Sequence, residues 1–169
     1  MRIETVVGKI DSNTFIVQSC DTTIIIDAGA KLDDLQKALK GRKPSAILLT
    51  HEHYDHVFYL DDYKKEFTCL VITPTTEDEI VVGDIKIKPI LCPGHSPQSV
   101  CYLIGDNLFT GDVLFNGTIG RTDLPGSDSA LMQQTLRKLL DVKFKTAYHG
   151  HYEPSSYEEQ QKNIRRFLD

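Results

Sequence analysis

Histidine is distributed unevenly along this chain of 169 residues. Three of its six histidines fall, with an aspartate, in the heptapeptide THEHYDH of residues 50–56, directly after the apolar run AILL of residues 46–49. The other three lie in two places, His95 in CPGHSPQS and the pair His149 and His151 in AYHGHYEP. Packing does not require imidazole and carboxylate groups at the end of a buried strand, so the pattern indicates a metal site.

The spacing within the heptapeptide suits two neighbouring metal positions. His51 and His53 are two residues apart, so in an extended segment their side chains point to the same side and can bind one ion. Asp55 and His56 then belong to the turn into a following helix and can face a second point nearby. Imidazole nitrogen and carboxylate oxygen are suitable ligands for zinc, iron or manganese.

Donors from later segments could complete both positions. His95 would be the third nitrogen ligand of the first ion, and Asp112 could bridge two ions about 3.5–4 Å apart, as in two-metal hydrolytic sites. A histidine from the carboxyl-terminal segment would complete the second set. Spacing alone leaves His149 and His151 as alternatives, because both can lie on one side of an extended segment.

Hydrophobic periodicity predicts alternating strands and helices. The predicted strands cover residues 2–7, 14–18, 22–27, 45–49, 69–73, 99–104, 108–110 and 144–148, with a hairpin over 79–90. The predicted helices cover residues 30–41 and 129–140, a stretch starting near residue 56, and a final helix that opens with a capping box of Ser155 and Glu158. Residues 111–128 read as a long glycine-containing loop. Two sheets with helices outside them fit this order.

The candidate donors follow predicted strands. At most two residues separate His51, Asp112 and His151 from the end of a preceding predicted strand, and four separate His95 from one. Loops at the ends of strands are held by a rigid sheet and commonly carry sites.

Bulk composition is that of an ordinary globular protein, with 40% hydrophobic and 25% charged residues and a net charge of −5. The length predicts a single domain over residues 1–169. We expect no nucleic-acid partner, because there is no basic stripe, and no membrane partner, because no apolar run is long enough to span a bilayer. The first residues lack the apolar core of a signal peptide, which predicts a cytoplasmic location; the oligomeric state stays open.

The motifs, taken together, resemble the metallo-β-lactamase fold superfamily. The matching residues are H-x-H-x-D-H at residues 51–56, PGHSPQSV around His95, FTGDVLF around Asp112 and HGHYEP around His151. They occur in the family's order over nearly the whole chain. The resemblance implies an α/β fold, a four-layered αββα sandwich with the site at one edge of its two sheets.

Within the superfamily, residues 111–128 look most like the small bacterial glyoxalase II-like, or hydroxyacylglutathione hydrolase-like, enzymes. That resemblance implies a dinuclear metal-dependent hydrolase of small thioesters such as S-lactoylglutathione, or of related esters, acting by attack of a metal-bound hydroxide on the carbonyl. It implies two divalent metal ions, with zinc expected and iron or manganese as alternatives.

The resemblance also assigns ligands, residue by residue. His51, His53 and His95 would hold the first metal; Asp55, His56 and His151 would hold the second; Asp112 would bridge them. Asp55 would also hold the nucleophilic water or accept its proton. The family ligand follows a glycine, as His151 follows Gly150, which places His149 where the family usually has proline.

Two other functions remain open. Persulfide dioxygenases share the GRTD of residues 120–123 and by resemblance would bind a single iron through His51, His95 and Asp112. A protein that binds metal without turnover would be expected to have lost Asp55 or Asp112, and both are present.

Four positions outside the ligand set also matter. Asp27 either orients a metal-ligand loop or caps a turn before Gly29. Phe58 and Tyr59 replace two glycines that the family usually has, which changes packing beside the site or narrows a pocket. Gln98 replaces the usual glycine of the turn that carries His95.

Overall fold

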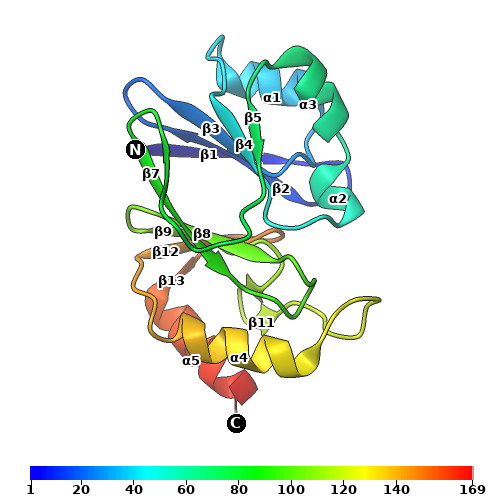
Figure 1. Ribbon diagram of the computed structural model, residues 1–169, viewed down its shortest axis with the longest axis vertical. Helices are drawn as coiled ribbons and strands as arrows, with labels where there is room; N and C mark the ends of the chain where they lie inside the picture. The colour runs from blue at the N-terminus through cyan, green and yellow to red at the C-terminus, as the bar shows by residue number, and fades with distance from the viewer. Residues whose placement is uncertain (169) are drawn as a thin grey trace.

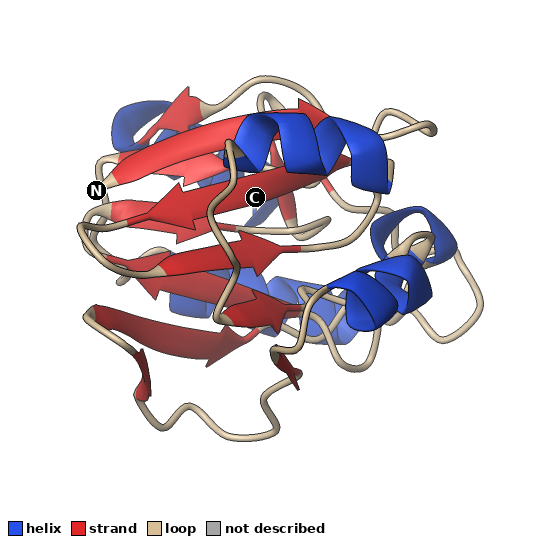
Figure 2. Ribbon diagram, turned by 90° about the horizontal axis from the view of Figure 1, so that it is seen from above, coloured by secondary structure: helices blue, strands red, loops and turns tan. Residues whose placement is uncertain are grey.

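The fold is a sandwich of two β-sheets covered on both outer faces by helices, seen in a computed structural model that describes residues 1–168 (Figure 1). One sheet has the order β1-β2-β3-β4-β5 and the other β13-β12-β9-β8-β7-β6. Helices α1 and α3 cover the first sheet, and α4 and α5 cover the second (Figures 1 and 2). This is the four-layered αββα arrangement expected from the sequence, which is confirmed.

The elements have the following bounds. The first sheet contains β1 (Arg2–Val7), β2 (Asn13–Gln18), β3 (Thr23–Ile26), β4 (Ala46–Leu48) and β5 (Leu70–Ile72). The second contains β6 (Ile80–Val82), β7 (Ile85–Leu91), β8 (Val100–Ile104), β9 (Asn107–Phe109), β12 (Thr146–Tyr148) and β13 (Ser155–Ser156). The helices are α1 (Leu32–Leu39), α2 (Tyr54–Val57), α3 (Leu60–Glu66), α4 (Ser129–Leu139) and α5 (Tyr157–Leu168).

Three apolar clusters separate the four layers, and strand alternation divides residues among them. Ile24 and Ile26 of β3 face the cluster between the sheets, whereas Ile25 between them faces the cluster under α1 and α3. Leu108 of β9 faces α4 and α5, while the adjacent Phe109 packs between the sheets. Because strands buried on both faces need apolar residues throughout, β3 and β4 read as continuous apolar runs.

Parallel pairing brings strand ends to one edge of the sandwich. β3, β4 and β5 are mutually parallel neighbours, and β9 is parallel to β12. The loops after β4, β9 and β12 therefore leave their sheets at carboxyl ends, which is where the sequence places His51, Asp112 and His151.

Three local predictions need correction. The segment predicted as a loop over residues 111–128 contains a hairpin, β10 (Leu114–Phe115) with β11 (Thr118–Ile119), turning at Asn116-Gly117 with Gly117 at φ 80°. Asn-Gly is a strong hairpin signal that the prediction overlooked. The single helix predicted from residue 56 is two helices, α2 and α3, because Tyr59 between them has a non-helical backbone, φ −104° and ψ 15°.

The third correction concerns the start of α5. The capping box uses Ser156 and Glu159, not Ser155 and Glu158: the backbone N–H of Ser156 donates to Glu159 Oε2 over 2.7 Å, and that of Glu159 donates to Ser156 Oγ over 3.3 Å. Ser155 is instead buried, with its hydroxyl turned toward His149.

No helix within residues 1–168 is long and apolar enough to cross a membrane.

We predict that Leu136→Ala lowers the free energy of unfolding by about 2–5 kcal/mol, because Leu136 is fully buried between α4 and the second sheet and its truncation leaves a cavity. Leu131→Ala on the same helix is the matched control; Leu131 is 36% exposed, so the loss should stay below about 1 kcal/mol. Urea unfolding of both variants measures the difference. Equal losses would contradict this description of the α4 core face.

Candidate metal centre

The seven residues predicted as ligands come from five loops or helix starts. His51 and His53 follow β4, Asp55 and His56 lie in α2, His95 lies between β7 and β8, Asp112 follows β9, and His151 follows β12. Of these, His51, His56, His95 and Asp112 are buried, and the other three are partly exposed. Both sheets thus contribute donors to one site.

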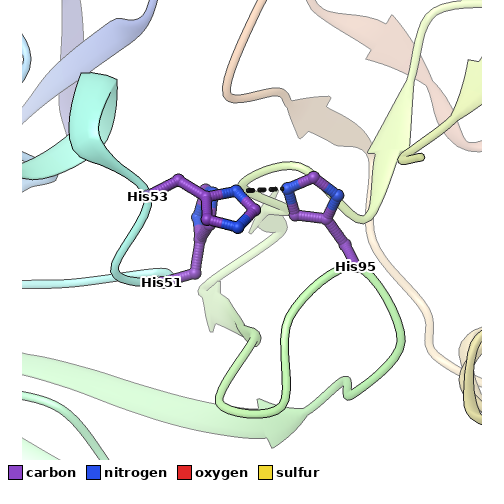
Figure 3. A group of neighbouring side chains, drawn as sticks. All are labelled: His51, His53 and His95. Atoms are coloured by element: carbon purple, nitrogen blue, oxygen red, sulfur yellow. Dashed lines mark hydrogen bonds between the residues drawn. The ribbon is translucent and has the colours of Figure 1, made fainter. Parts of the chain in front are cut away.

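The donor atoms gather in three overlapping groups, within each of which they lie within 4.8 Å of one another. The groups are His51, His53 and His95; His51, His56 and Asp112; and Asp55, His56 and His151. In the first group His53 and His95 approach from different loops, with Nδ1 of His53 2.8 Å from Nε2 of His95 (Figure 3). His149 belongs to none of these groups among the described residues.

Asp112 lies between the two outer sets of donors. Its Oδ2 is 3.9 Å from Nε2 of His51 and 3.5 Å from Nε2 of both His95 and His151. Its Oδ1 is 3.2 Å from Nε2 of His56. A carboxylate in this position could share its two oxygens between metal ions held by the donor sets on either side.

The chemistry of these buried atoms fits a cation. Nε2 of His51, Nε2 of His56 and Oδ1 of Asp112 are buried and have no hydrogen-bond partner among residues 1–168. The last two are close together but lack the geometry of a hydrogen bond. Buried polar atoms without partners are costly, and three of them directed at one space are the donors that a divalent metal satisfies.

The imidazoles are oriented by acceptors on their outer side. Nδ1 of His56 lies 2.8 Å from Asp27 Oδ2, and Nδ1 of His51 lies 3.0 Å from Thr50 Oγ1. Because the Thr50 hydroxyl donates to Asp27, its oxygen can accept from Nδ1 of His51. With Nδ1 as the donor, the neutral form of each ring has its lone pair on Nε2, directed into the site.

Backbone carbonyls orient two further histidines by accepting a hydrogen bond from Nδ1 of each ring. Nδ1 of His95 is 3.0 Å from the carbonyl oxygen of Arg121, and Nδ1 of His151 is 3.0 Å from that of Asp11. Nδ1 is the donor in both pairs, since a carbonyl oxygen only accepts. In the neutral form of each ring Nε2 therefore carries the lone pair that could bind a metal; in the metal-free structure Nε2 of His95 lies 2.8 Å from Nδ1 of His53, and Nε2 of His151 lies 3.1 Å from Oδ2 of Asp55.

Asp27 orients the ligand loop and does not merely cap a turn. It is fully buried, has a left-handed backbone at φ 62°, and accepts hydrogen bonds from the backbone N–H and hydroxyl of Thr50 over 2.8 and 2.7 Å, besides its contact with His56. A non-glycine residue in this conformation is uncommon and persists only where its surroundings fix it.

Gly150 allows the last loop to approach the centre. A Cβ atom at this position would lie 2.1 Å from Oδ1 of Asp112 and 2.7 Å from Cε1 of His56. Residue 150 must therefore be glycine for His151 to reach the site.

Burial and neighbouring charges strongly shift the pKa values of the histidines in the metal-free centre. Burial lowers the pKa of His56, but the carboxylates of Asp27 and Asp112 outweigh it and raise the pKa to about 10. Hydrogen bonds to Asp112 and Asp55 raise the pKa of His151 to about 10 as well. Burial lowers the pKa of His51 well below its ordinary value. Without a metal, protons on two imidazoles therefore balance the carboxylates.

His149 lies beneath the site and connects two ligand loops. It is fully buried, with Nδ1 2.9 Å from Thr110 Oγ1 and Nε2 2.8 Å from Ser155 Oγ. Burial lowers its pKa to about 4, so the ring is neutral at neutral pH. The sequence did not indicate that Thr110 and Ser155 would contact His149, because a hydroxyl at a strand end is too common to be a signal.

A pocket of about 750 Å³ opens onto the centre. Five predicted ligands line it, and so do residues of α2, of the β10–β11 hairpin and the loop that follows it, and of the segment after β12. These further residues are Tyr54, Phe115, Thr118, Ile119, Arg121, Leu124, Pro125 and Tyr152.

The departures from the family pattern are accommodated locally. The ring centroid of Phe58 is 4.7 Å from that of Tyr54 and 4.6 Å from that of Tyr59. Among the described residues that line the pocket, Tyr54 is included but Phe58 and Tyr59 are not, so the two aromatic residues change packing beside the site. Gln98 is not among the described residues with positive φ, so its turn does not require glycine.

Comparison with solved structures shows the same architecture. The crystal structure of the BLEG-1 B3 metallo-β-lactamase superposes with a TM-score of 0.91 at 25% identity, covering 99% of this chain and 100% of that one. ETHE1 from Myxococcus xanthus superposes with a TM-score of 0.86 at 21% identity, covering 99% of this chain and 85% of that one. TTHA1623 in a di-iron-bound form superposes with a TM-score of 0.84 at 24% identity, covering 96% of this chain and 98% of that one.

Sequence comparison finds relatives among hydrolases. The "Probable metallo-hydrolase YqgX" of Bacillus subtilis is 31% identical, with 80% of this chain and 82% of that protein covered. A hydroxyacylglutathione hydrolase of Rhizobium etli is 34% identical over 76% of this chain but only 57% of that enzyme. The family profile described as "Metallo-beta-lactamase superfamily" matches residues 7–80 and 70–151. The chain therefore belongs to the metallo-β-lactamase superfamily, whose members are metal-dependent hydrolases.

Proposed function

We propose that this protein is a dinuclear metal-dependent hydrolase of small thioesters, of the S-lactoylglutathione type, or of related esters. The observation that carries the proposal is the gathering of six donor side chains around Asp112; three of them place an imidazole nitrogen within 3.9 Å of one of its carboxylate oxygens. The similarity to a hydroxyacylglutathione hydrolase supports the thioester class.

In this proposal His51, His53 and His95 hold one ion and Asp55, His56 and His151 hold the other. Asp112 binds both. Two such cations, when bound, would lower the pKa of a water molecule toward neutrality and polarise the substrate carbonyl. Zinc suits these nitrogen and oxygen donors, while iron and manganese suit them too, and a similar fold binds two iron ions.

Asp55 is the residue that we propose to act directly on the attacking water. It lines the pocket, and its Oδ2 is 3.1 Å from Nε2 of His151. Burial raises the pKa of this carboxyl, but the hydrogen bond from His151 and the charge of His56 lower it more, so the pKa lies below its ordinary value. An ionised carboxylate at this point accepts a hydrogen bond from water and holds it for attack.

The test is metal analysis of protein purified without chelator, paired with a thioester hydrolysis assay. We expect close to two metal equivalents per chain, because seven donors serve two ions. We also expect Asp112→Asn to lose most of the hydrolysis with an unchanged fold, because the shared carboxylate neutralises both ions. Asp62→Asn, on the exposed face of α3, is the control and should retain activity.

Three outcomes would overturn this proposal. One bound iron with oxygen uptake on a persulfide would identify a dioxygenase. Two bound metals without turnover of any ester or thioester would identify a metal-binding protein. Near wild-type turnover by Asp112→Asn would exclude the dinuclear mechanism.

A second prediction separates His149 from His151. His151→Ala should empty one metal position, because it removes a proposed ligand. His149→Ala should keep two metals bound with affinity reduced by about 10–100-fold, the usual effect of losing a group that orients ligands. Metal stoichiometry and affinity of both variants measure this. Loss of a metal in His149→Ala alone would reverse the assignment.

Metal loading should also depend on pH. In the metal-free protein the pKa values of His56 and His151 are about 10, so both rings are protonated at pH 7 and an ion must displace their protons. Binding at pH 7 should release about two protons, and affinity should rise with pH. In the metal-free protein these charge pairs stabilise the fold at and below neutral pH, and this contribution disappears as the pH rises through about 10.

Calorimetric titration in two buffers with different ionisation enthalpies counts these protons. Release of none would show that the two rings are already neutral in the metal-free protein.

A further inference from the structure

The rim of the pocket carries two exposed tyrosines. Tyr54 at the start of α2 is 65% exposed, and Tyr152, directly after His151, is 70% exposed, yet both line the pocket. An exposed aromatic ring beside a site offers apolar area and a hydroxyl for a ligand to cover.

Both rings are held in place by their neighbours. Tyr152 has a left-handed backbone, φ 66°, and its carbonyl oxygen accepts a hydrogen bond from Asn13 Nδ2 over 3.0 Å. Its ring contacts Phe115 edge to face, at 5.7 Å between centroids. Tyr54 contacts Phe58 in the same way at 4.7 Å. A bulky residue at positive φ is rare, and rare backbone conformations cluster at ligand-binding positions.

A second wall of the pocket is also apolar. Phe115 is buried and lines the pocket, as do Ile119 and Leu124 from the segment that follows. Aromatic and aliphatic side chains thus form most of the lining outside the donor set.

Positive charge is scarce by comparison. Among the described residues that line the pocket, Arg121 is the single arginine or lysine, and it is engaged by Asp123 through Nε and Nη2 over 2.9 and 3.0 Å. A glutathione group carries two carboxylates and coenzyme A several phosphates, which call for several free cations. The pocket does not provide them.

We infer that, among small thioesters, the preferred substrate has an acyl group that ends in an apolar, planar ring and an uncharged thiol portion in place of glutathione. This inference rests on the proposed hydrolase function and narrows its substrate class away from S-lactoylglutathione. The planar group would lie against the aromatic rim formed by Tyr54 and Tyr152, with the carbonyl toward the donor set.

The test compares metal-loaded protein on acetyl and phenylacetyl thioesters of N-acetylcysteamine, which is neutral, and of glutathione. We expect kcat/KM to be at least about 10-fold higher for phenylacetyl than for acetyl, because burying apolar groups in a fitted pocket gives discrimination of this order. For the same acyl group, glutathione should give no advantage. Equal rates for both acyl groups, or a 10-fold preference for glutathione, would overturn the inference.

Variants locate the preference. Tyr152→Asn keeps a residue that tolerates positive φ, and Tyr54→Ser removes the other ring; each should reduce the phenylacetyl-to-acetyl ratio toward one. Val81→Asn, 59% exposed on β6, is the control and should leave the ratio unchanged. An unchanged ratio in both tyrosine variants would overturn the inference.

Binding of the product acids gives a result that does not need turnover. Saturation-transfer NMR on metal-loaded protein should detect phenylacetate more strongly than acetate, and Tyr152→Asn should remove the difference. If no thioester is hydrolysed, the proposed function fails. The comparison of the two acids still tests whether the pocket has an apolar subsite, because equal signals would exclude one.

Discussion

The centre depends on one buried carboxylate, that of Asp27. A carboxyl group with no solvent exposure is stable only if its oxygens are hydrogen-bonded, and Thr50 and His56 supply those bonds. The bonds join the end of β3 to the loop after β4 and the start of α2. They fix His56 directly and His51 through the Thr50 hydroxyl. Two of the most buried imidazoles thus acquire their orientation from a residue that does not itself face the site.

The negative charge of the carboxylates explains why they are surrounded by imidazoles that can hold protons or metal ions. The carboxylates of Asp27 and Asp112 raise the pKa of His56, and those of Asp112 and Asp55 raise the pKa of His151. In the metal-free protein, protons on these two histidines offset the carboxylate charge. A bound metal ion would replace those protons and would also give a partner to the unpartnered Nε2 of His51 and Oδ1 of Asp112.

Strand and helix periodicity predicted most of the elements, the family resemblance implied their four-layered arrangement, and the dense histidine motif singled out the donors that the structure brings together. The β10–β11 hairpin was not predicted, although Asn116-Gly117 marks it, and the cap of α5 was predicted one residue early. The carbonyls of Asp11 and Arg121 could not be predicted, since every residue has a carbonyl and only the tertiary fold selects these two. The left-handed backbone of Tyr152 is equally hidden, because tyrosine does not favour it.

The division of donors between the two sheets has a consequence for assembly. His51 to His56 belong to the first β-sheet layer, whereas His95, Asp112 and His151 belong to the second. Neither layer alone holds a complete set, so high-affinity loading requires that the two have already docked. Bound ions would then cross-link the two layers. Separation of the layers and release of the ions would become a single cooperative event.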